Sequence, residues 1–258
     1  MTEFNMEPEE LFSVRAHFYA GAYDMAINES ASVIADSDTL RQLTSYFQIR
    51  ASQALGRHLP QHLDLKTPLD HLCAAVSYLR FGNIRQALSV LHNQPPSLDC
   101  IALRVQLYLD LCRFDLAQEE FKKLAKLDDD DVLSMVTGVK LAACGYGDAT
   151  QAKDIINDLI QRFGMTILLG EMKAALAMRT SQFSDALQAL KQCRSLARNN
   201  GQAIPSATLF NSIVCLDHLG DQFPKNDDIR CKLVQELKQF YPDHHYFVME
   251  RQVLESFA

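Results

Sequence analysis

Apolar residues recur along this chain at the spacing of one helix face, in pairs of segments joined by short turns. The clearest pair covers residues 97–131. Ile101 and Val105 mark the buried face of its first helix, and Phe121 and Leu124 mark that of its second. A helix pair of this size cannot bury both apolar faces by itself. The pattern therefore predicts similar units on either side.

A small residue recurs near the start of the second helix of each pair, where a short side chain lets two helix backbones approach closely. These residues are Ala26, Ala87, Ala117, Ala152 and Ala186, so the successive intervals are 61, 30, 35 and 34 residues. An interval of about 34 residues is that of tetratricopeptide repeats. The sequence therefore predicts an all-α protein whose tetratricopeptide-like helix pairs form a right-handed α-solenoid, a curved array.

We expect one solenoid domain over residues 1–258, with an irregular or truncated unit at about 56–66, where Pro60 interrupts the pattern. Helices within about 227–257 are expected to cap the array. The other helices are predicted over 9–20, 23–34, 37–55, 68–81, 84–93, 149–163, 166–180, 183–199 and 205–219, besides the pair within 97–131 and a further helix that starts at Asp131.

Several polar residues are typical of helix starts. Asp36-Ser37-Asp38, Thr67-Pro68 and Ser97 each precede an apolar periodic segment. The acidic run Asp128–Asp131 has two interpretations, a divalent-cation site or a helix N-terminus rich in carboxylates. The ligand spacing, glycine and final glutamate of a calcium-binding loop are missing, which favours the helix N-terminus.

Composition agrees with an all-α protein and excludes some functions. The 258 residues include 10 Gly, 8 Pro and no Trp, and the net charge is −7 with a pI near 5.6. Such an acidic chain without a long basic stripe argues against nucleic-acid binding. No apolar run is long enough to span a bilayer, and the first ten residues lack a signal-peptide core, so no membrane insertion is expected. Seven scattered cysteines indicate a reducing, cytoplasmic compartment.

The sequence carries no motif of a catalytic, cofactor or metal site. Phosphate-binding loops, zinc-protease motifs and nucleophile elbows are absent. His244-His245 has no third ligand at suitable spacing and is interpreted as a solvent-facing helix start. His58, His62 and His71 are interpreted as surface residues. We therefore expect no enzymatic activity, no cofactor and no metal.

Function is then expected on a surface, and in helix-pair arrays the first helix of each pair lines the concave side. Apolar residues on that side are candidates for partner binding, although each could also belong to the core. Their apolar character suits a protein segment better than a free carboxylate terminus. The candidates are Leu11, Arg15, Phe18, Tyr19, Leu72, Val76, Leu79, Gln106, Leu109, Ala175, Met178, Phe210 and Val214.

Three segments resemble one family in order and wording. They are ELFSVRAHFYAGAYDMAINES at 10–30, SLDCIALRVQLYLDLCRFDLAQEEFKKL at 97–124 and TLFNSIVCLDHLG at 208–220. They are similar to the coatomer epsilon subunit, epsilon-COP. The resemblance implies a structural subunit of the COPI vesicle coat, without cofactor, that binds the C-terminal domain of the alpha coatomer subunit. It implies a cytoplasmic protein, peripheral on Golgi membranes and COPI-coated vesicles, in retrograde Golgi-to-ER transport.

The sequence departs from the family in two regions, and it leaves two rival functions open. The chain is expected to be shorter than the family between residues 38 and 70, and it differs after Pro242. The first rival is an unrelated cytosolic tetratricopeptide adaptor that binds a peptide segment of another protein. A compact charged pocket would favour this adaptor, and a long apolar groove the coat subunit. The second rival is an enzyme with a site in the inner cavity, which would need converging titratable residues.

Overall fold

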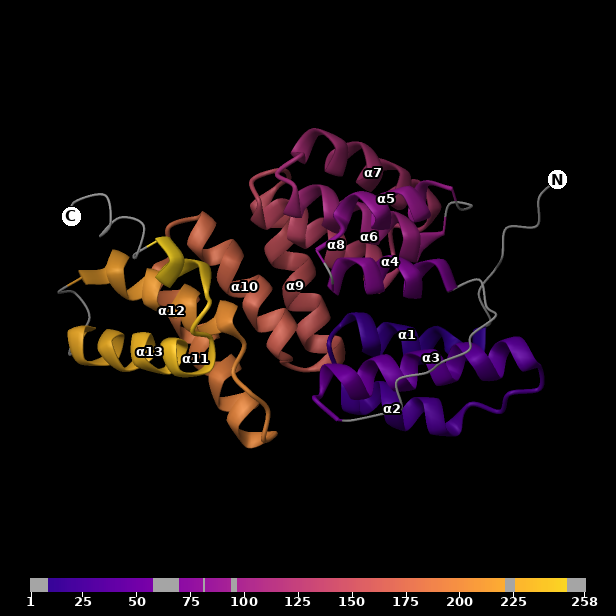
Figure 1. Cartoon of the computed structure of the whole chain (residues 1–258), viewed down its shortest axis with the longest axis horizontal. Coiled ribbons are helices and arrows are strands. Elements are labelled where there is room, and N and C mark those ends of the chain that lie inside the picture. Colours follow the sequence, from indigo (N-terminus) through magenta and orange to yellow (C-terminus); the bar gives the residue numbers. More distant parts are fainter. Residues whose placement is uncertain (1–8, 58–69, 81, 94–96, 221–225, 250–258) are drawn as a thin grey trace. The chain divides into compact units, whose positions relative to one another are not determined.

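The computed structural model describes residues 9–57, 70–80, 82–93, 97–220 and 226–249. Within these ranges every regular element is a helix, which confirms the all-α prediction (Figure 1). The chain divides into two compact units, Met1–Gly164 and Met165–Ala258, here called the N-terminal and C-terminal units. The single solenoid domain stays a prediction.

The N-terminal unit consists of helix pairs with one additional helix after the first pair. The order is η1 (Glu9–Leu11), α1 (Phe12–Tyr19), α2 (Tyr23–Ser32), α3 (Asp38–Ala54), α4 (Asp70–Arg80), α5 (Ile84–His92), α6 (Leu98–Asp110), α7 (Phe114–Leu127), α8 (Val132–Ala143) and α9 (Ala149–Phe163). Helices α1, α2 and α3 pack against one another, and α1 also packs against α8 (Figure 1).

The C-terminal unit has two further helix pairs. They are formed by α10 (Ile167–Arg179) with α11 (Phe183–Asn199) and by α12 (Ser206–Leu219) with α13 (Asn226–Phe240). Residues 245–249 are helical up to the last described residue. His244 precedes this helix, and its Nδ1 accepts a hydrogen bond from the backbone N–H of Tyr246, which confirms the predicted helix start.

The five alanines that defined the repeat all occupy the fourth residue of the second helix of a pair. Each is at most 3% exposed, as expected at a close helix crossing. In the same five pairs, the turn before the second helix contains a residue with positive φ. These residues are Gly21, Gly82, Cys112, Gly145 and Ser181. Backbone hydrogen bonds close these turns, such as Arg113 N–H to the Tyr108 carbonyl at 2.8 Å. The predicted helix pairs are therefore confirmed in both units.

Side chains predicted to begin helices do so. The Ser37 hydroxyl accepts a hydrogen bond from Leu40 N–H, and Ser97 does the same for Cys100. Asp131 is the N-cap of α8, with Leu133 N–H donating to its carboxylate at 2.8 Å. The predicted helix N-terminus at Asp128–Asp131 is therefore confirmed.

One helix ends earlier than predicted. The helix expected over 23–34 ends at Ser32, and Val33 is extended, with ψ of 121°. Ile34 is 88% exposed, so its side chain does not continue the buried face. The apolar Ile34 fits the helical spacing in the sequence, so the predicted helix included it, but its side chain has no neighbour to pack against.

Some predictions lie outside the described residues. They include most of the irregular unit at 56–66, the helix start at Thr67-Pro68, His58 and His62. In the described ranges, no helix combines the length and the apolar character that crossing a membrane requires.

Each unit has its own core. In the N-terminal unit, Leu11, Phe47, Leu91 and Leu107 bring η1, α3, α5 and α6 together. In the C-terminal unit, Leu190, Leu209, Ile213 and Leu237 join α11, α12 and α13. Burying each such side chain contributes roughly 1.5–3 kcal/mol.

Candidate functional site

The N-terminal unit encloses a hollow of about 290 Å³, which is the candidate site. Every lining residue lies on α1, α3, α4, α6 or α8, and none on the second helix of a pair. This volume suits a few side chains rather than a whole domain. The lining residues are Phe18, Tyr19, Tyr46, Arg50, Leu72, Val76, Asp99, Ala102, Leu103, Val105, Gln106, Leu109, Leu133, Thr137 and Lys140.

Aromatic packing holds one wall of the hollow in place. The Phe18 ring meets the rings of Tyr19, Tyr23 and Phe47 edge-on, with centroids 5.2 to 5.7 Å apart. Edge-to-face pairs of this kind stabilise a defined ring orientation. Gly21, with a φ of 76°, follows the C-cap residue of α1 and lies between Tyr19 and Tyr23 in the sequence. The apolar wall is therefore preformed.

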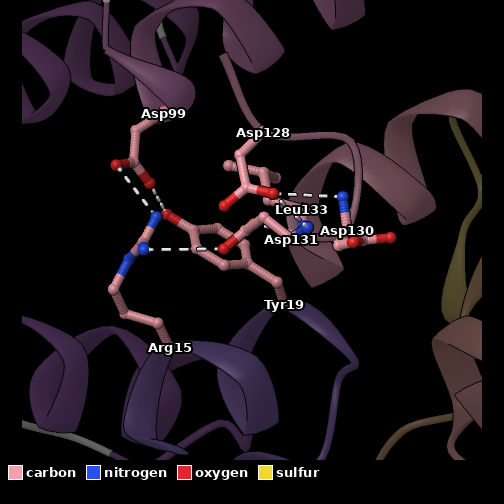
Figure 2. Close-up of polar contacts among 7 residues, drawn as sticks. All are labelled: Arg15, Tyr19, Asp99, Asp128, Asp130, Asp131 and Leu133. Atoms are coloured by element: carbon pink, nitrogen blue, oxygen red, sulfur yellow. Dashed lines mark hydrogen bonds and ion pairs between the residues drawn. The ribbon is translucent and has the colours of Figure 1, made fainter. Parts of the chain in front are cut away.

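An ion-pair cluster joins α1 to α6 and α8 beside the hollow, and we define it as Arg15, Tyr19, Asp99 and Asp131. Arg15 Nη2 lies 3.5 Å from Asp99 Oδ2, and its Nη1 lies 3.7 Å from Asp131 Oδ2. The Tyr19 hydroxyl donates to Asp99. Figure 2 shows Arg15 rising from α1 between the two carboxylates. These charges are nearly buried, so each depends on the others.

Burial has the largest effect on the acidity of Asp131 in this cluster. Burial raises the pKa of the Asp131 carboxyl, while the positive charge of Arg15 opposes that rise. The same carboxylate accepts the N–H of Leu133, so it caps α8 and pairs with α1 at once (Figure 2).

Two cations line the hollow. Lys140 Nζ donates to Gln106 Oε1 at 3.0 Å, and the Gln106 amide in turn donates to Asp110 Oδ1 at 2.8 Å. Burial lowers the pKa of Lys140, and the charge of Asp110 opposes this. Among the described residues, no carboxylate forms an ion pair with Lys140, and the buried Nε of Arg50 has no hydrogen-bond acceptor. Both groups are thus available to an anionic group in the hollow.

The structure brings six of the predicted contact residues together in the hollow. They are Phe18, Tyr19, Leu72, Val76, Gln106 and Leu109. Leu11 is instead 1% exposed in the core, and Arg15 belongs to the ion-pair cluster. Leu79 packs on the core of the N-terminal unit.

The other four predicted contact residues belong to the C-terminal unit and are no part of the hollow. Met178 and Phe210 pack against its core, and Ala175 and Val214 are partly buried on α10 and α12. Their role in partner binding stays a prediction.

Sequence reasoning missed the polar residues of the hollow, chiefly Arg50, Asp99 and Lys140. A shift of 34 residues, the repeat length, leads from Gln106 to Lys140, so the repeat itself held this signal. Arg50 lies on α3, whose apolar pattern was loose. Asp99 gave no signal, because its position on α6 is that of an ordinary acidic residue in a first helical turn.

No metal site accompanies the hollow in the part of the chain that the structure describes. Within these ranges, no three or more His, Cys, Asp or Glu side chains are grouped to hold an ion.

Comparison with known proteins supplies the family. A profile described as "Coatomer epsilon subunit" matches residues 7–68 and 61–257, and its two segments meet where the array was expected to be shortened. The rice coatomer subunit epsilon-1 is 27% identical, over 92% of this chain and 92% of its own length.

Other relatives and one solved structure are similar to the chain. Coatomer subunit epsilon of Caenorhabditis elegans is 23% identical over 93% of both chains. A solved tetratricopeptide repeat protein from Parabacteroides merdae has a TM-score of 0.46 at 14% identity and covers 89% of this chain and 97% of its own. From the family profile and the relatives, this chain belongs to the coatomer epsilon subunit family.

Proposed function

We propose that this chain binds the C-terminal domain of the alpha coatomer subunit and, within the COPI coat, supports retrograde Golgi-to-ER transport. Family membership makes it a subunit of the coatomer, a cytosolic coat, and a structural protein rather than an enzyme. Its place would be peripheral, on Golgi membranes and COPI-coated vesicles.

One observation of the structure carries the proposed binding mode. The hollow is lined only by α3 and by the first helices of the pairs in the N-terminal unit, and ring contacts hold its apolar wall before any partner arrives. A preformed apolar concavity loses little conformational entropy on binding. It can accept one or two projecting side chains of a partner segment.

The test is co-expression with the alpha C-terminal domain of the same organism, followed by size exclusion and calorimetry. Val76→Asp replaces an apolar contact of the wall by a carboxylate that loses its water on binding, and it should weaken binding at least about tenfold, or about 1.4 kcal/mol. Met25→Asp, on exposed α2 and outside the hollow, is the matched control and should bind as the wild type does. Failure of the folded wild-type chain to bind would contradict the proposal.

The adaptor for short peptides is the second candidate, because the hollow is compact and carries Arg50 and Lys140. The same experiment distinguishes the two functions. A coat subunit requires the folded alpha domain, whereas an adaptor would bind an isolated peptide with similar affinity.

A further inference from the structure

The hollow has more cationic groups than its apolar wall requires. Of its lining residues, Arg50, Lys140 and Asp99 are charged. Asp99 already accepts from Arg15 and Tyr19 in the ion-pair cluster. The remaining two charges are positive, in a chain whose net charge is −7. The local charge of the hollow is therefore opposite to that of the whole protein.

Among the described residues, neither cation forms an ion pair with a carboxylate. Lys140 has a neutral amide oxygen of Gln106 as its hydrogen-bond acceptor, and Asp110 reaches that amide only from its other end. The Nε of Arg50 is buried without an acceptor among the described residues. A cation that is removed from water without a counter-charge is costly, and its pKa falls, as burial does to Lys140.

A surface that only packs against other coat subunits has no need of cations whose removal from water costs free energy. Two half-buried cations without a carboxylate partner among the described residues are typical of a site that completes its ion pairs on binding. Apolar side chains, including Phe18 and Val76, line the same hollow as the two cations. A ligand that fills the hollow therefore also needs an apolar group to contact them. One ligand must thus combine a carboxylate with an adjacent apolar group.

We propose that the hollow is an anchor pocket for an internal acidic segment of the partner, in which an Asp or Glu side chain pairs with Lys140 and Arg50 and a neighbouring apolar side chain fills the wall. This inference rests on the proposed function for the identity of the partner. It adds which chemistry the partner segment presents.

The first arm of the test uses the full chain and the alpha C-terminal domain. Lys140→Met keeps length and removes charge, and it should weaken binding about tenfold. Arg50→Met should weaken it in the same direction, and both losses should shrink in high salt. Lys122→Met on exposed α7 removes a charge away from the hollow and should leave the affinity unchanged.

Neutralising the partner's acidic residues one at a time, as Asn or Gln, identifies the paired carboxylate. One of them should lose its effect when combined with Lys140→Met, which is the mark of a direct pair in a double-mutant cycle. If removing the partner's C-terminal residues gives that result instead, the carboxylate is a chain terminus, and the proposed internal segment is wrong.

The second arm does not depend on the partner. Phenylbutyrate carries a carboxylate beside an apolar ring, and phenylbutyramide is its neutral match. NMR titration of the full chain should show the carboxylate binding about tenfold more tightly than the amide, with this preference lost in Lys140→Met. Circular dichroism confirms that each variant is folded.

The outcomes separate the two proposals. If Val76→Asp abolishes binding of the alpha domain while Lys140→Met and Arg50→Met leave it unchanged, the proposed function stands and the acidic anchor is wrong. If the alpha domain does not bind but phenylbutyrate is preferred through Lys140, the anchor chemistry stands and the proposed partner is wrong. Equal binding of phenylbutyrate and phenylbutyramide would overturn the anchor.

Discussion

Arg15 on α1 and Asp131 at the start of α8 lie 3.7 Å apart, between Nη1 and Oδ2, although most of the N-terminal unit separates them in sequence. This contact places the first helix of the unit against its fourth helix pair. Because α1 and α8 both line the hollow, the same contact sets the distance across it. The hollow therefore depends on a buried ion-pair cluster rather than on apolar packing alone.

Arg15→Met tests this dependence. The substitution leaves Asp99 and Asp131 without their cation in a nearly buried place, so we expect a loss of about 3–5 kcal/mol in the free energy of unfolding. Urea unfolding measures it. Arg41→Met removes an exposed pair with Asp38 and should cost less than about 1 kcal/mol. Equal effects of the two variants would show that the cluster is energetically unimportant.

Glu120 on α7 should make the free energy of unfolding depend on pH in the acidic range. Although burial raises the pKa of its carboxyl, Lys123 and Arg104 lower it below the ordinary value of 4.5. As pH falls below 4.5, the unfolded chain takes up a proton before the native chain does, so the free energy of unfolding declines until the folded pKa is passed. Urea unfolding at decreasing pH should show this decline, and Glu120→Gln should remove its share. A parallel decline in both proteins would contradict the assignment.

Ser181 occupies a turn position that favours glycine. Its φ is 57°, whereas Gly21 and Gly82 hold the corresponding turns at 76° and 73°. Ser181→Gly relieves this left-handed backbone, and we expect a gain of roughly 1 kcal/mol in stability. Ser195→Gly, at an exposed position inside α11, should lose about the same amount. Thermal unfolding compares the two, and a destabilised Ser181→Gly would refute the strain.

Gly170 marks a close approach of α10 and α11. A Cβ built at this position would lie 2.3 Å from Cys193 Sγ, which is far inside van der Waals contact. Gly170→Ala should therefore cost about 1–3 kcal/mol by overpacking. Cys193→Ala removes the obstructing sulfur, so the double variant should recover part of the loss. Additive losses in a double-mutant cycle would show that the cost arises elsewhere.

The helices and turns of this protein follow from local features of its sequence. Helix bounds, the alanines at the crossings, the turns and the caps at Ser37, Ser97 and Asp131 depend on side-chain spacing and on hydrogen bonds between residues a few positions apart. Such interactions are encoded locally and repeat with the helix pair. The same repeat placed six predicted contact residues on the lining of the hollow.

Which of these residues meet depends on the packing of the helix pairs and could not be predicted from local spacing. The pairing of Arg15 with Asp99 and Asp131, and the convergence of Arg50 and Lys140 on one hollow, depend on how each helix pair is rotated against the next. That rotation results from the packing of many side chains. Because a small change in the rotation at each pair accumulates along the array, it shifts distant helices against one another by whole residues. Leu11 shows the consequence, because it shares the periodicity of Phe18 and yet is buried in the core.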